Sequence, residues 1–441
     1  MTAGPQFWCE QAWLPTGVAR GVVVRADGAG RITEVSAAPT PPAGAHRLPG
    51  VVLPGFANAH SHAFHRALRG RTHDGGGTFW TWREAMYTLA ERLDPDRYLR
   101  LARAVFAEMV LTGYSCVGEF HYLHHAPGGA RYADPNAMGE ALRQAAAEAG
   151  IRLTLLDTCY LAGGIDAPLA GPQLRFGDGT AAAWAARVAE LTEDDNTRIG
   201  AAVHSVRAVP REALPEVVAG APAGRPLHVH LSEQPAENEA CRDRYGCTPT
   251  ELLHAAGALS ERTTAVHATH LTARDVALLG AARTGVCFCP TTEGDLADGI
   301  GPARELVDAG CRLSLGSDQH AVVDPLAEAQ ALEHGARMRS NRRGRFRPVE
   351  LLAAATERGH ECLGWPGNGR IAVGAHCDLV AVRLDTPRTA GVLPEQVLLA
   401  ASASDVDTVV VGGRVVARGG RHETLGEVGR VLAEVVEELW S

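Results

Sequence analysis

Between residues 51 and 360, short β-branched apolar stretches alternate eight times with longer stretches rich in Ala, Leu, Arg and Glu. Arg97–Leu111, Asn136–Gly150 and Thr180–Glu193 have the composition of helices. This repeated alternation predicts an α/β fold, a (β/α)8 TIM-like barrel rather than a doubly wound sheet. The expected strands are Val51–Ala57, Ser115–Glu119, Ile151–Asp157, Arg198–His204, Pro226–His230, Thr263–His267, Gly285–Cys289 and Cys311–Ser317.

The two ends of the chain have a different character from the middle. Both alternate β-branched and turn residues, and Val411-Gly412-Gly413 favours a hairpin. We therefore expect the termini to build one small antiparallel domain, a β-sandwich of residues 1–52 plus 366–441, beside a barrel of residues 53–365. The strand-like segments are Gly21–Arg25, Arg31–Val35, Gly369–Leu384 and Asp407–Ala417.

Composition excludes several classes of function. The 42 basic residues are all arginine and the net charge is −9, so we expect no nucleic-acid partner. Without lysine, Schiff-base and Walker-type chemistry are ruled out. The ten cysteines form no C-x-x-C pair, which favours free thiols over a zinc cluster or a disulfide framework. With no signal peptide or membrane span in the sequence, we expect a soluble cytoplasmic protein, and we also expect a homodimer.

Polar residues stand at the carboxyl ends of nearly all the expected strands. In a (β/α)8 barrel the active site forms at this face, from the ends of several strands. Chance rarely places so many histidine and acidic residues there, so we expect a site built from them. The residues are His60, His62, Glu119, Asp157, His204, His230, His267 and Asp318.

The segment Asn58-Ala59-His60-Ser61-His62 is the sharpest local signal, because strand alternation points both imidazoles to one side. Together with a histidine after strands five and six and Asp318 after strand eight, it resembles the amidohydrolase superfamily over essentially the whole chain. The superfamily's binuclear centres are bridged by a modified lysine, which this chain lacks. The resemblance therefore implies one divalent ion, held by His60, His62, His230 and Asp318. Nitrogen and oxygen ligands suit zinc, with iron and manganese as alternatives.

The resemblance also assigns catalytic roles. The spacing of His230 and Glu233 is typical of the superfamily's deaminases. A bound metal lowers the pKa of water from 15.7 towards about 7. Asp318 and His267 would orient this water and take its proton, and Glu233 would deliver a proton to the departing nitrogen.

A second motif points to the substrate. The segments His62-Ala63-Phe64-His65-Arg66 and Phe79-Trp80-Thr81-Trp82-Arg83 resemble the formiminoglutamate deiminases. That resemblance implies hydrolysis of N-formimino-L-glutamate to N-formyl-L-glutamate and ammonia. Guanidinium groups bind carboxylates bidentately, which suits this small dicarboxylate. The implied substrate-binding residues are His65, Arg83, Tyr122, His204 and Arg207, while Trp80 and Trp82 are expected to pack.

One position departs from that family, because His65 stands where glutamine is expected. Histidine also forms hydrogen bonds but can become charged near neutral pH, so the contact at this position is in doubt. Two other functions stay open. An aromatic aminohydrolase acting on guanine or cytosine would favour amide and aromatic contacts over two arginines. A catalytically silent metal-binding scaffold would have no need of Glu233, His267 and Asp318 together.

Overall fold

The central body of the molecule is a parallel barrel, as predicted. The computed structural model describes residues 4–73, 77 and 79–441, the side chains of residues 79 and 80 excepted. Eight parallel strands follow one another around the barrel, and Ser61 pairs with Asp318 to join the last strand region to the first. The strands are β5 (Phe56–Ser61), β6 (Tyr114–His121), β7 (Arg152–Cys159), β8 (Thr197–Val203), β9 (Leu227–Leu231), β10 (Thr263–His267), β11 (Gly285–Phe288) and β12 (Arg312–Leu315).

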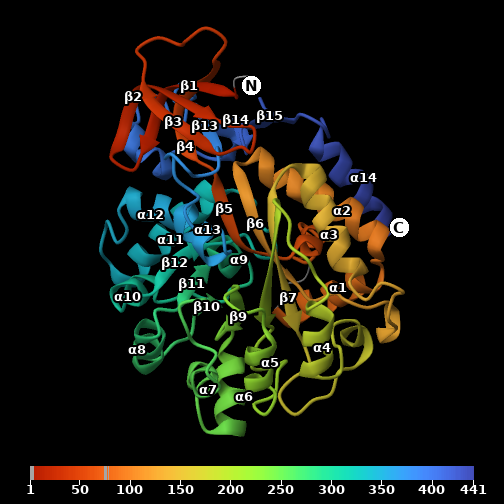
Figure 1. Cartoon of the computed structure of the whole chain (residues 1–441). Helices are drawn as coiled ribbons and strands as arrows, with labels where there is room; N and C mark the ends of the chain where they lie inside the picture. Colours follow the sequence, from red (N-terminus) through yellow and green to blue (C-terminus); the bar gives the residue numbers. More distant parts are fainter. Residues whose placement is uncertain (1–3, 74–76, 78) are drawn as a thin grey trace.

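Both termini contribute to a second eight-stranded sheet, which lies above the barrel in Figure 1. It has its own apolar core, in which Phe7, Val24, Leu48 and Leu379 are buried. Val411 pairs with Arg414, so the predicted Gly-Gly hairpin is present. The strands are β1 (Gln6–Leu14), β2 (Gly17–Ala26), β3 (Ile32–Ala37), β4 (His46–Pro54), β13 (Leu379–Val382), β14 (Val406–Val411), β15 (Arg414–Arg418) and β16 (Arg421–His422).

Two expectations about this region are wrong. The sheet is not purely antiparallel, because β1 and β4 pair in parallel. The single strand expected at 51–57 is two strands in different sheets, β4 and β5. Gly55 separates them: a Cβ atom there would lie 2.4 Å from the Ser115 hydroxyl, and the Gly55 N–H donates to the Asp378 carbonyl. The chain turns from one sheet to the other where only glycine fits.

Helices surround the barrel, and two predicted ones correspond closely to α2 and α3. The third, α4, begins at a Thr180 cap but ends earlier than expected. The helix α14, which sequence reasoning did not anticipate, packs against α2 (Figure 1). The helices are α1 (Phe79–Glu91), α2 (Pro95–Leu111), α3 (Ala137–Ala149), α4 (Ala181–Val188), α5 (Leu214–Gly220), α6 (Pro235–Tyr245), α7 (Pro249–Ala255), α8 (Ala273–Ala281), α9 (Pro290–Asp295), α10 (Ala303–Asp308), α11 (Pro325–Ser340), α12 (Pro348–Ala355), α13 (Glu357–Cys362) and α14 (Val428–Trp440).

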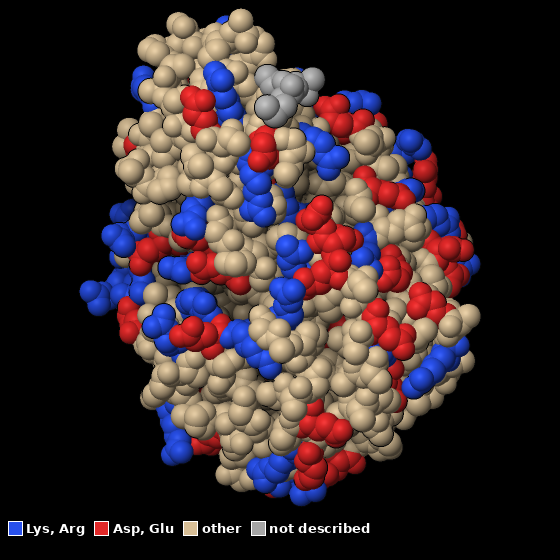
Figure 2. Space-filling view, in the orientation of Figure 1, with Lys and Arg blue, Asp and Glu red and all other residues tan. Residues whose placement is uncertain are grey.

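Charged side chains of both signs are interspersed over the face of the molecule shown in Figure 2. Among the described residues, no helix is both long enough and apolar enough to cross a membrane. The barrel strands, in contrast, are buried along nearly their whole length. Burial on both faces extends to the polar residues that these strands carry, Glu119, Asp157 and His230 among them.

Candidate metal centre and substrate pocket

The four residues predicted to bind metal meet at the carboxyl end of the barrel. His60 lies on β5, His62 directly follows it, His230 lies on β9 and Asp318 follows β12. All four side chains are buried. The barrel closes at this same point, since the Ser317 and Asp318 N–H groups donate to the His60 carbonyl at 3.1 and 3.0 Å. Closure of the barrel therefore brings the first and last ligand together.

The donor atoms converge at distances that suit one ion. The His230 Nε2 atom lies 3.1 Å from His60 Nε2 and 3.4 Å from His62 Nε2. The Asp318 Oδ1 atom lies 3.3 and 3.4 Å from the same two nitrogens. Ligands about 2.0–2.1 Å from a tetrahedral zinc ion are about 3.3–3.4 Å apart. These four separations suit a single small divalent cation. His267 also brings a ligand atom within 4.8 Å of those of His60, His230 and Asp318.

Neighbouring groups hold these ligands in place. The His62 Nδ1 atom lies 2.9 Å from the Phe120 carbonyl. A hydrogen bond donated there fixes the tautomer that presents Nε2 to a metal. Asn58 binds Ser317 twice, through its amide nitrogen to the hydroxyl at 2.6 Å and its amide oxygen to the N–H at 2.9 Å. Asn58 had no predicted role, although only Ala59 separates it from the H-x-H segment.

Glu119, another strand-end residue, is hydrogen-bonded to the H-x-H segment and to the residue after it. Its carboxylate accepts hydrogen bonds from the Ser61 hydroxyl and the Ala63 N–H, both at 2.6 Å. Burial raises its pKa to about 8, against the lowering effect of these two bonds. Glu119 is fully buried and lies outside the lining of the pocket described below. It holds the H-x-H segment from outside the pocket.

The three predicted catalytic residues also lie together. The His267 Nε2 atom is 3.9 Å from Glu233 Oε1 and 3.9 Å from Asp318 Oδ2. On its other side, His267 Nδ1 lies 3.4 Å from Glu293, a carboxylate with no predicted role. His267 and Asp318 have φ angles of 68° and 43°. Such left-handed conformations cost energy in residues other than glycine and cluster at functional sites.

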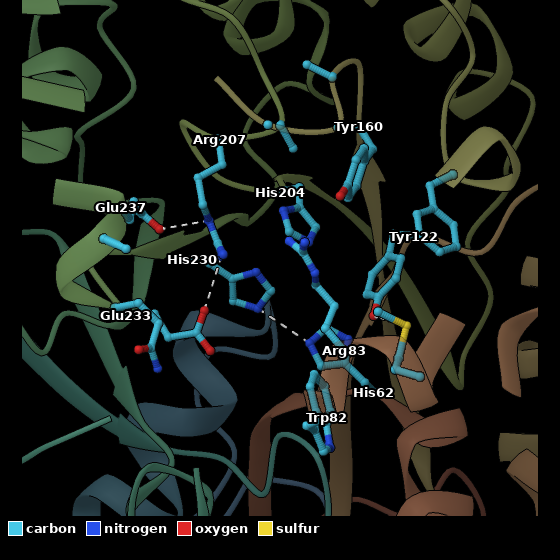
Figure 3. Close-up of a pocket in the computed structure, with 18 of the residues that line it drawn as sticks. His62, Trp82, Arg83, Tyr122, Tyr160, His204, Arg207, His230, Glu233 and Glu237 are labelled. Carbon is cyan, nitrogen blue, oxygen red and sulfur yellow. Dashed lines mark hydrogen bonds and ion pairs between the residues drawn. The ribbon is translucent and has the colours of Figure 1, made fainter. Parts of the chain in front are cut away.

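A pocket of about 290 Å³ opens over these groups (Figure 3). The carboxylates of Glu233 and Glu237 lie on one side of it, and Tyr122, Tyr160 and Arg83 on the other. The five residues predicted to bind substrate all line this pocket: His65, Arg83, Tyr122, His204 and Arg207.

His65, the position that departs from the expected motif, is held as a neutral group. Its Nε2 atom lies 2.8 Å from the Tyr122 hydroxyl, and its ring meets Trp82 edge-on with centroids 5.0 Å apart. Burial, reinforced by the neighbouring histidines, keeps its pKa well below the usual range. Trp82, expected only to pack, also lines the pocket. The Trp80 side chain lies outside the described residues.

The pocket carries two arginines from separate elements. Arg83 lies on α1 and Arg207 follows β8. Tyr160, which sequence reasoning missed, lies near both of them: its pKa is raised by burial, and both guanidinium groups oppose that shift. Burial keeps the pKa of His204 well below normal, and the two arginines lower it further. Two positive charges thus act on the same part of the pocket.

Arg207 has a second set of partners that was not predicted. Its Nη2 atom lies 3.2 Å from Glu233 Oε2, and its Nε atom lies 3.1 Å from Glu237 Oε2 (Figure 3). Glu237 lies in the first turn of α6, four residues after Glu233. A charged residue at that spacing resembles an ordinary exposed helix position, so only the structure shows its place in the pocket.

Asp157, expected at the site because it ends a strand, lies elsewhere. Both of its oxygens accept hydrogen bonds from Arg187, at 2.7 and 2.9 Å, and one also accepts from Trp184 Nε1. It belongs to a buried cluster with His121 and His124, outside the lining of the pocket. The expectation that each polar strand end faces the site is wrong here. Arg187 from α4 donates hydrogen bonds to both carboxylate oxygens of Asp157.

Comparison with known proteins identifies the family of this chain. The amidohydrolase family model matches residues 51–416. A formimidoylglutamate deiminase of Pseudomonas aeruginosa is 36% identical, over 98% of this chain and 99% of that protein. An 8-oxoguanine deaminase of the same organism is 30% identical, over 82% and 81%. The crystal structure of an amidohydrolase from Brucella melitensis has a TM-score of 0.91 at 29% identity, over 99% and 100% of the two chains. This chain is therefore a hydrolase of carbon–nitrogen bonds that belongs to the amidohydrolase family.

Proposed function

We propose that this chain hydrolyses N-formimino-L-glutamate to N-formyl-L-glutamate and ammonia. The observation that carries the proposal is the pair of arginines, Arg83 and Arg207, in a pocket that also holds the converging His/Asp cluster. Guanidinium groups are planar forks that match carboxylates. A substrate with two carboxylates and one reactive carbon suits this arrangement, and a 36% identical relative is a formimidoylglutamate deiminase.

The size of the pocket supports a small substrate. Its volume of about 290 Å³ lies just below the ~300–1,000 Å³ typical of ligand pockets. The Tyr122 and His65 side chains, joined by a 2.8 Å hydrogen bond, supply polar atoms near the H-x-H segment. We infer that they orient the substrate, and that the neutral His65 serves where the related family has glutamine.

We further propose that the cofactor is one zinc ion held by His60, His62, His230 and Asp318. When bound, such an ion supplies Lewis-acid chemistry and makes water a nucleophile at neutral pH. His267 and Asp318 lie close enough to each other to orient the attacking water and accept its proton.

In this proposal, Glu233 carries the proton that leaves with the product nitrogen. Its Oε1 atom lies 3.9 Å from His267 Nε2. The same carboxyl group can therefore accept a proton near His267 and deliver it to the substrate nitrogen. Water adds to the formimino carbon, the carbon–nitrogen bond to the terminal nitrogen breaks, and that nitrogen departs as ammonia with the transferred proton. General acid–base groups of this kind typically contribute about 10²–10⁴-fold to the rate.

An aromatic aminohydrolase is the second candidate, and one observation favours it. Trp82, Tyr122 and Tyr160 line the pocket, and aromatic rings can stack on a flat base. A relative with 30% identity is an 8-oxoguanine deaminase. Against this reading, a neutral base has no carboxylate for the two planar guanidinium groups to bind.

The test is ammonia release from a panel of substrates by purified, metal-loaded protein. The panel contains N-formimino-L-glutamate, guanine, 8-oxoguanine and cytosine, with metal content measured on the same preparation. We expect N-formimino-L-glutamate to have the highest kcat/KM by a wide margin. Faster turnover of any of the three bases would overturn the proposal in favour of the aromatic aminohydrolases.

A further inference from the structure

The indole of Trp440, at the end of α14, contacts two segments of the barrel domain. Its Nε1 atom donates a hydrogen bond to the Ala67 carbonyl at 2.9 Å. Ala67 belongs to the short 3-10 helix η1 (Ala63–Leu68), which directly follows the H-x-H segment. The Cζ atom of Arg92, the residue after α1, lies over the indole ring at 5.3 Å from its centroid. One side chain of α14 therefore bridges η1 and the end of α1.

These two segments carry residues that we expect to bind the substrate. His65 lies in η1, Trp82 and Arg83 lie on α1, and all three line the pocket. The His65 and Trp82 rings meet edge-on with their centroids 5.0 Å apart. The position of η1 relative to α1 therefore decides how His65 and Arg83 face a substrate.

The hydrogen bond to Ala67 meets a requirement of the backbone. Carbonyl groups in the last turn of a helix have no partner within that helix. Ala67 is buried, and a buried carbonyl that is left without a partner costs free energy. The indole N–H of Trp440, which can only donate, supplies this partner from α14.

Two guanidinium groups strengthen the contact at the indole ring. The Cζ atoms of Arg92 and Arg71 lie 5.3 and 5.5 Å from the ring centroid, within the range of cation–π attraction. Arg71 lies shortly after η1, and Arg92 also donates from Nη1 to the Leu439 carbonyl at 2.6 Å. Each of the two segments thus presents one guanidinium to Trp440.

The helix that carries Trp440 is itself fixed to the barrel domain. Its apolar residues Leu432, Val435 and Leu439 are buried. Glu438 accepts two hydrogen bonds from Arg100 of α2, both at 2.7 Å. Because α14 is anchored to α2 in this way, a side chain at its end can fix the position of η1.

We propose that Trp440 is a positioning residue for substrate binding: it holds η1 against the end of α1 and thereby sets the positions of His65 and Arg83. Trp440 lies outside the lining of the pocket, so it acts through these two segments and not by touching the substrate. The inference rests on the proposed function only for the identity of the substrate. The arrangement itself belongs to the protein without substrate.

The first test measures this arrangement without any substrate. Trp440→Phe keeps an aromatic ring for the two guanidinium groups and removes the N–H. The His65, Arg69 and Arg71 N–H groups donate to nearby carbonyls at 3.0, 3.3 and 2.9 Å. In metal-loaded protein we expect these three amides to exchange with deuterium about two- to tenfold faster in Trp440→Phe than in wild type, the change in equilibrium that one lost hydrogen bond produces.

The second test separates substrate binding from turnover. With N-formimino-L-glutamate, Trp440→Phe should raise KM by about two- to tenfold. Its kcat should stay within about twofold of wild type, since the loss concerns binding and not the chemical step. Its metal content should be unchanged. A general loss of folded protein would instead lower kcat and metal content together.

The matched control is Trp8→Phe. The Trp8 Nε1 atom donates to the Ala38 carbonyl at 2.8 Å, in the domain built from the termini. This variant removes the same kind of bond, from an indole N–H to an alanine carbonyl, at a place away from η1. It should leave KM and the exchange of the three amides unchanged.

The outcomes separate this inference from the proposed function. If wild type releases no ammonia from N-formimino-L-glutamate, the proposed function fails, and the exchange comparison alone decides whether Trp440 holds η1. Unchanged exchange of the three amides in Trp440→Phe, or faster exchange with an unchanged KM, would overturn the positioning role. Effects of equal size in Trp8→Phe would also overturn it.

Discussion

Two buried clusters of histidine and carboxylate side chains stand at or near the carboxyl ends of the barrel strands. In the first, His60, His62, His230 and Asp318 bring four donor atoms within 3.1–3.4 Å of their neighbours. In the second, His121, His124 and Asp157 also have donor atoms close enough to hold an ion. Residue type and position on the strands do not tell these clusters apart.

The two clusters differ in the group that faces the carboxylate, which is Asp157 in the second cluster and Asp318 in the first. Arg187 donates to both oxygens of Asp157 and also to Asp178, at 2.7–3.1 Å. The second cluster thus contains its own cation, and a metal would have to displace or repel it. In the first cluster, Asp318 faces the imidazole nitrogens of His60 and His62. A strand-end cluster is a candidate metal centre when its carboxylate faces neutral donors, and a structural network when an arginine already holds it.

The largest difference should appear when a histidine is removed from each cluster. His230→Ala should lose metal and activity, because the loss of a Lewis acid worth several kcal/mol lowers the rate by about 10³-fold or more. His121→Ala should keep both. Metal analysis and ammonia release on the two variants check this. Metal loss in His121→Ala with retention in His230→Ala would reverse the assignment of the clusters.

Replacing a carboxylate beside each cluster with its amide should also give different results, a loss of kcat for Glu233 and a loss of stability for Asp178. Glu233→Gln should keep its metal and lose about 10²–10⁴-fold in kcat, the contribution of a general acid–base group. Asp178→Asn should keep its kcat and lose stability, because it removes a partner of Arg187. Kinetics and thermal unfolding of both variants provide the check. A Glu233→Gln enzyme within a few-fold of wild type would remove Glu233 from the mechanism.

Arginine substitutions allow the same comparison between the pocket, which contains Arg83 and Arg207, and the second cluster, which contains Arg187. Arg207→Met or Arg83→Met should lower kcat/KM for N-formimino-L-glutamate by about 30-fold to several thousand-fold, since truncating a buried charge partner costs about 2–5 kcal/mol. Lysine should restore only part of the loss, because it keeps the charge but not the planar fork. Normal kinetics in both methionine variants, with unchanged metal content, would show that neither arginine binds the substrate.

Arg187→Met should act on stability and leave the chemistry unchanged. Asp157 and Asp178 would lose their cation, and breaking a buried ion pair in this way costs about 3–5 kcal/mol. We expect a clear fall in Tm with kcat unchanged in the protein that remains folded. An unchanged Tm would mean that the network contributes little to the fold, and a loss of bound metal would mean that the clusters are not independent.

The smallest expected effect is the pH dependence of the free energy of unfolding that arises from His124. Burial and the nearby Arg187 lower the pKa of His124 to about 4, with Asp157 and Asp178 opposing them. In the unfolded chain His124 takes up a proton near pH 6.5. The unfolded state therefore binds more protons between pH 6.5 and 4, and the free energy of unfolding falls as pH falls through that window, by up to roughly 1.4 kcal/mol per pH unit for one group.

His124→Gln tests this titration. The amide can still donate to the Thr158 carbonyl, which His124 Nε2 contacts at 2.9 Å, but it does not titrate. Denaturant unfolding measured from pH 7 to pH 4 should show a shallower loss of stability in the variant. Parallel pH profiles for the two proteins would show that His124 has the same pKa folded and unfolded.

Much of the fold follows from periodicity. The repeated alternation of short β-rich runs with helical stretches locates seven of the eight barrel strands to within a few residues. The first could not be located, because residues 51–57 form one apolar run that the structure divides between two sheets at Gly55. The helix α14 was missed although its apolar residues Leu432, Val435 and Leu439 are buried. The strand-like segments of this end of the chain stop at Ala417, and the residues that follow were expected only as part of the β-sandwich domain.

The site was predictable where strand position decides it. The H-x-H segment, His230, His267 and Asp318 follow from the ends of strands, and the structure brings them together. Glu237, Tyr160 and Glu293 were not predictable, because their places depend on how α6, the loop after β7 and α9 pack over the barrel. Asp157 was misjudged for the same reason: its partner Arg187 is 30 residues away on α4.

The most direct test of the difference between the clusters is the position of the metal. Crystals of the metal-loaded protein, measured at the zinc absorption edge, would locate every zinc ion by anomalous scattering. We expect one strong peak among His60, His62, His230 and Asp318 and no peak at His121, His124 and Asp157, with about one ion per chain in solution. A peak in the second cluster, or two ions in the first, would contradict the account.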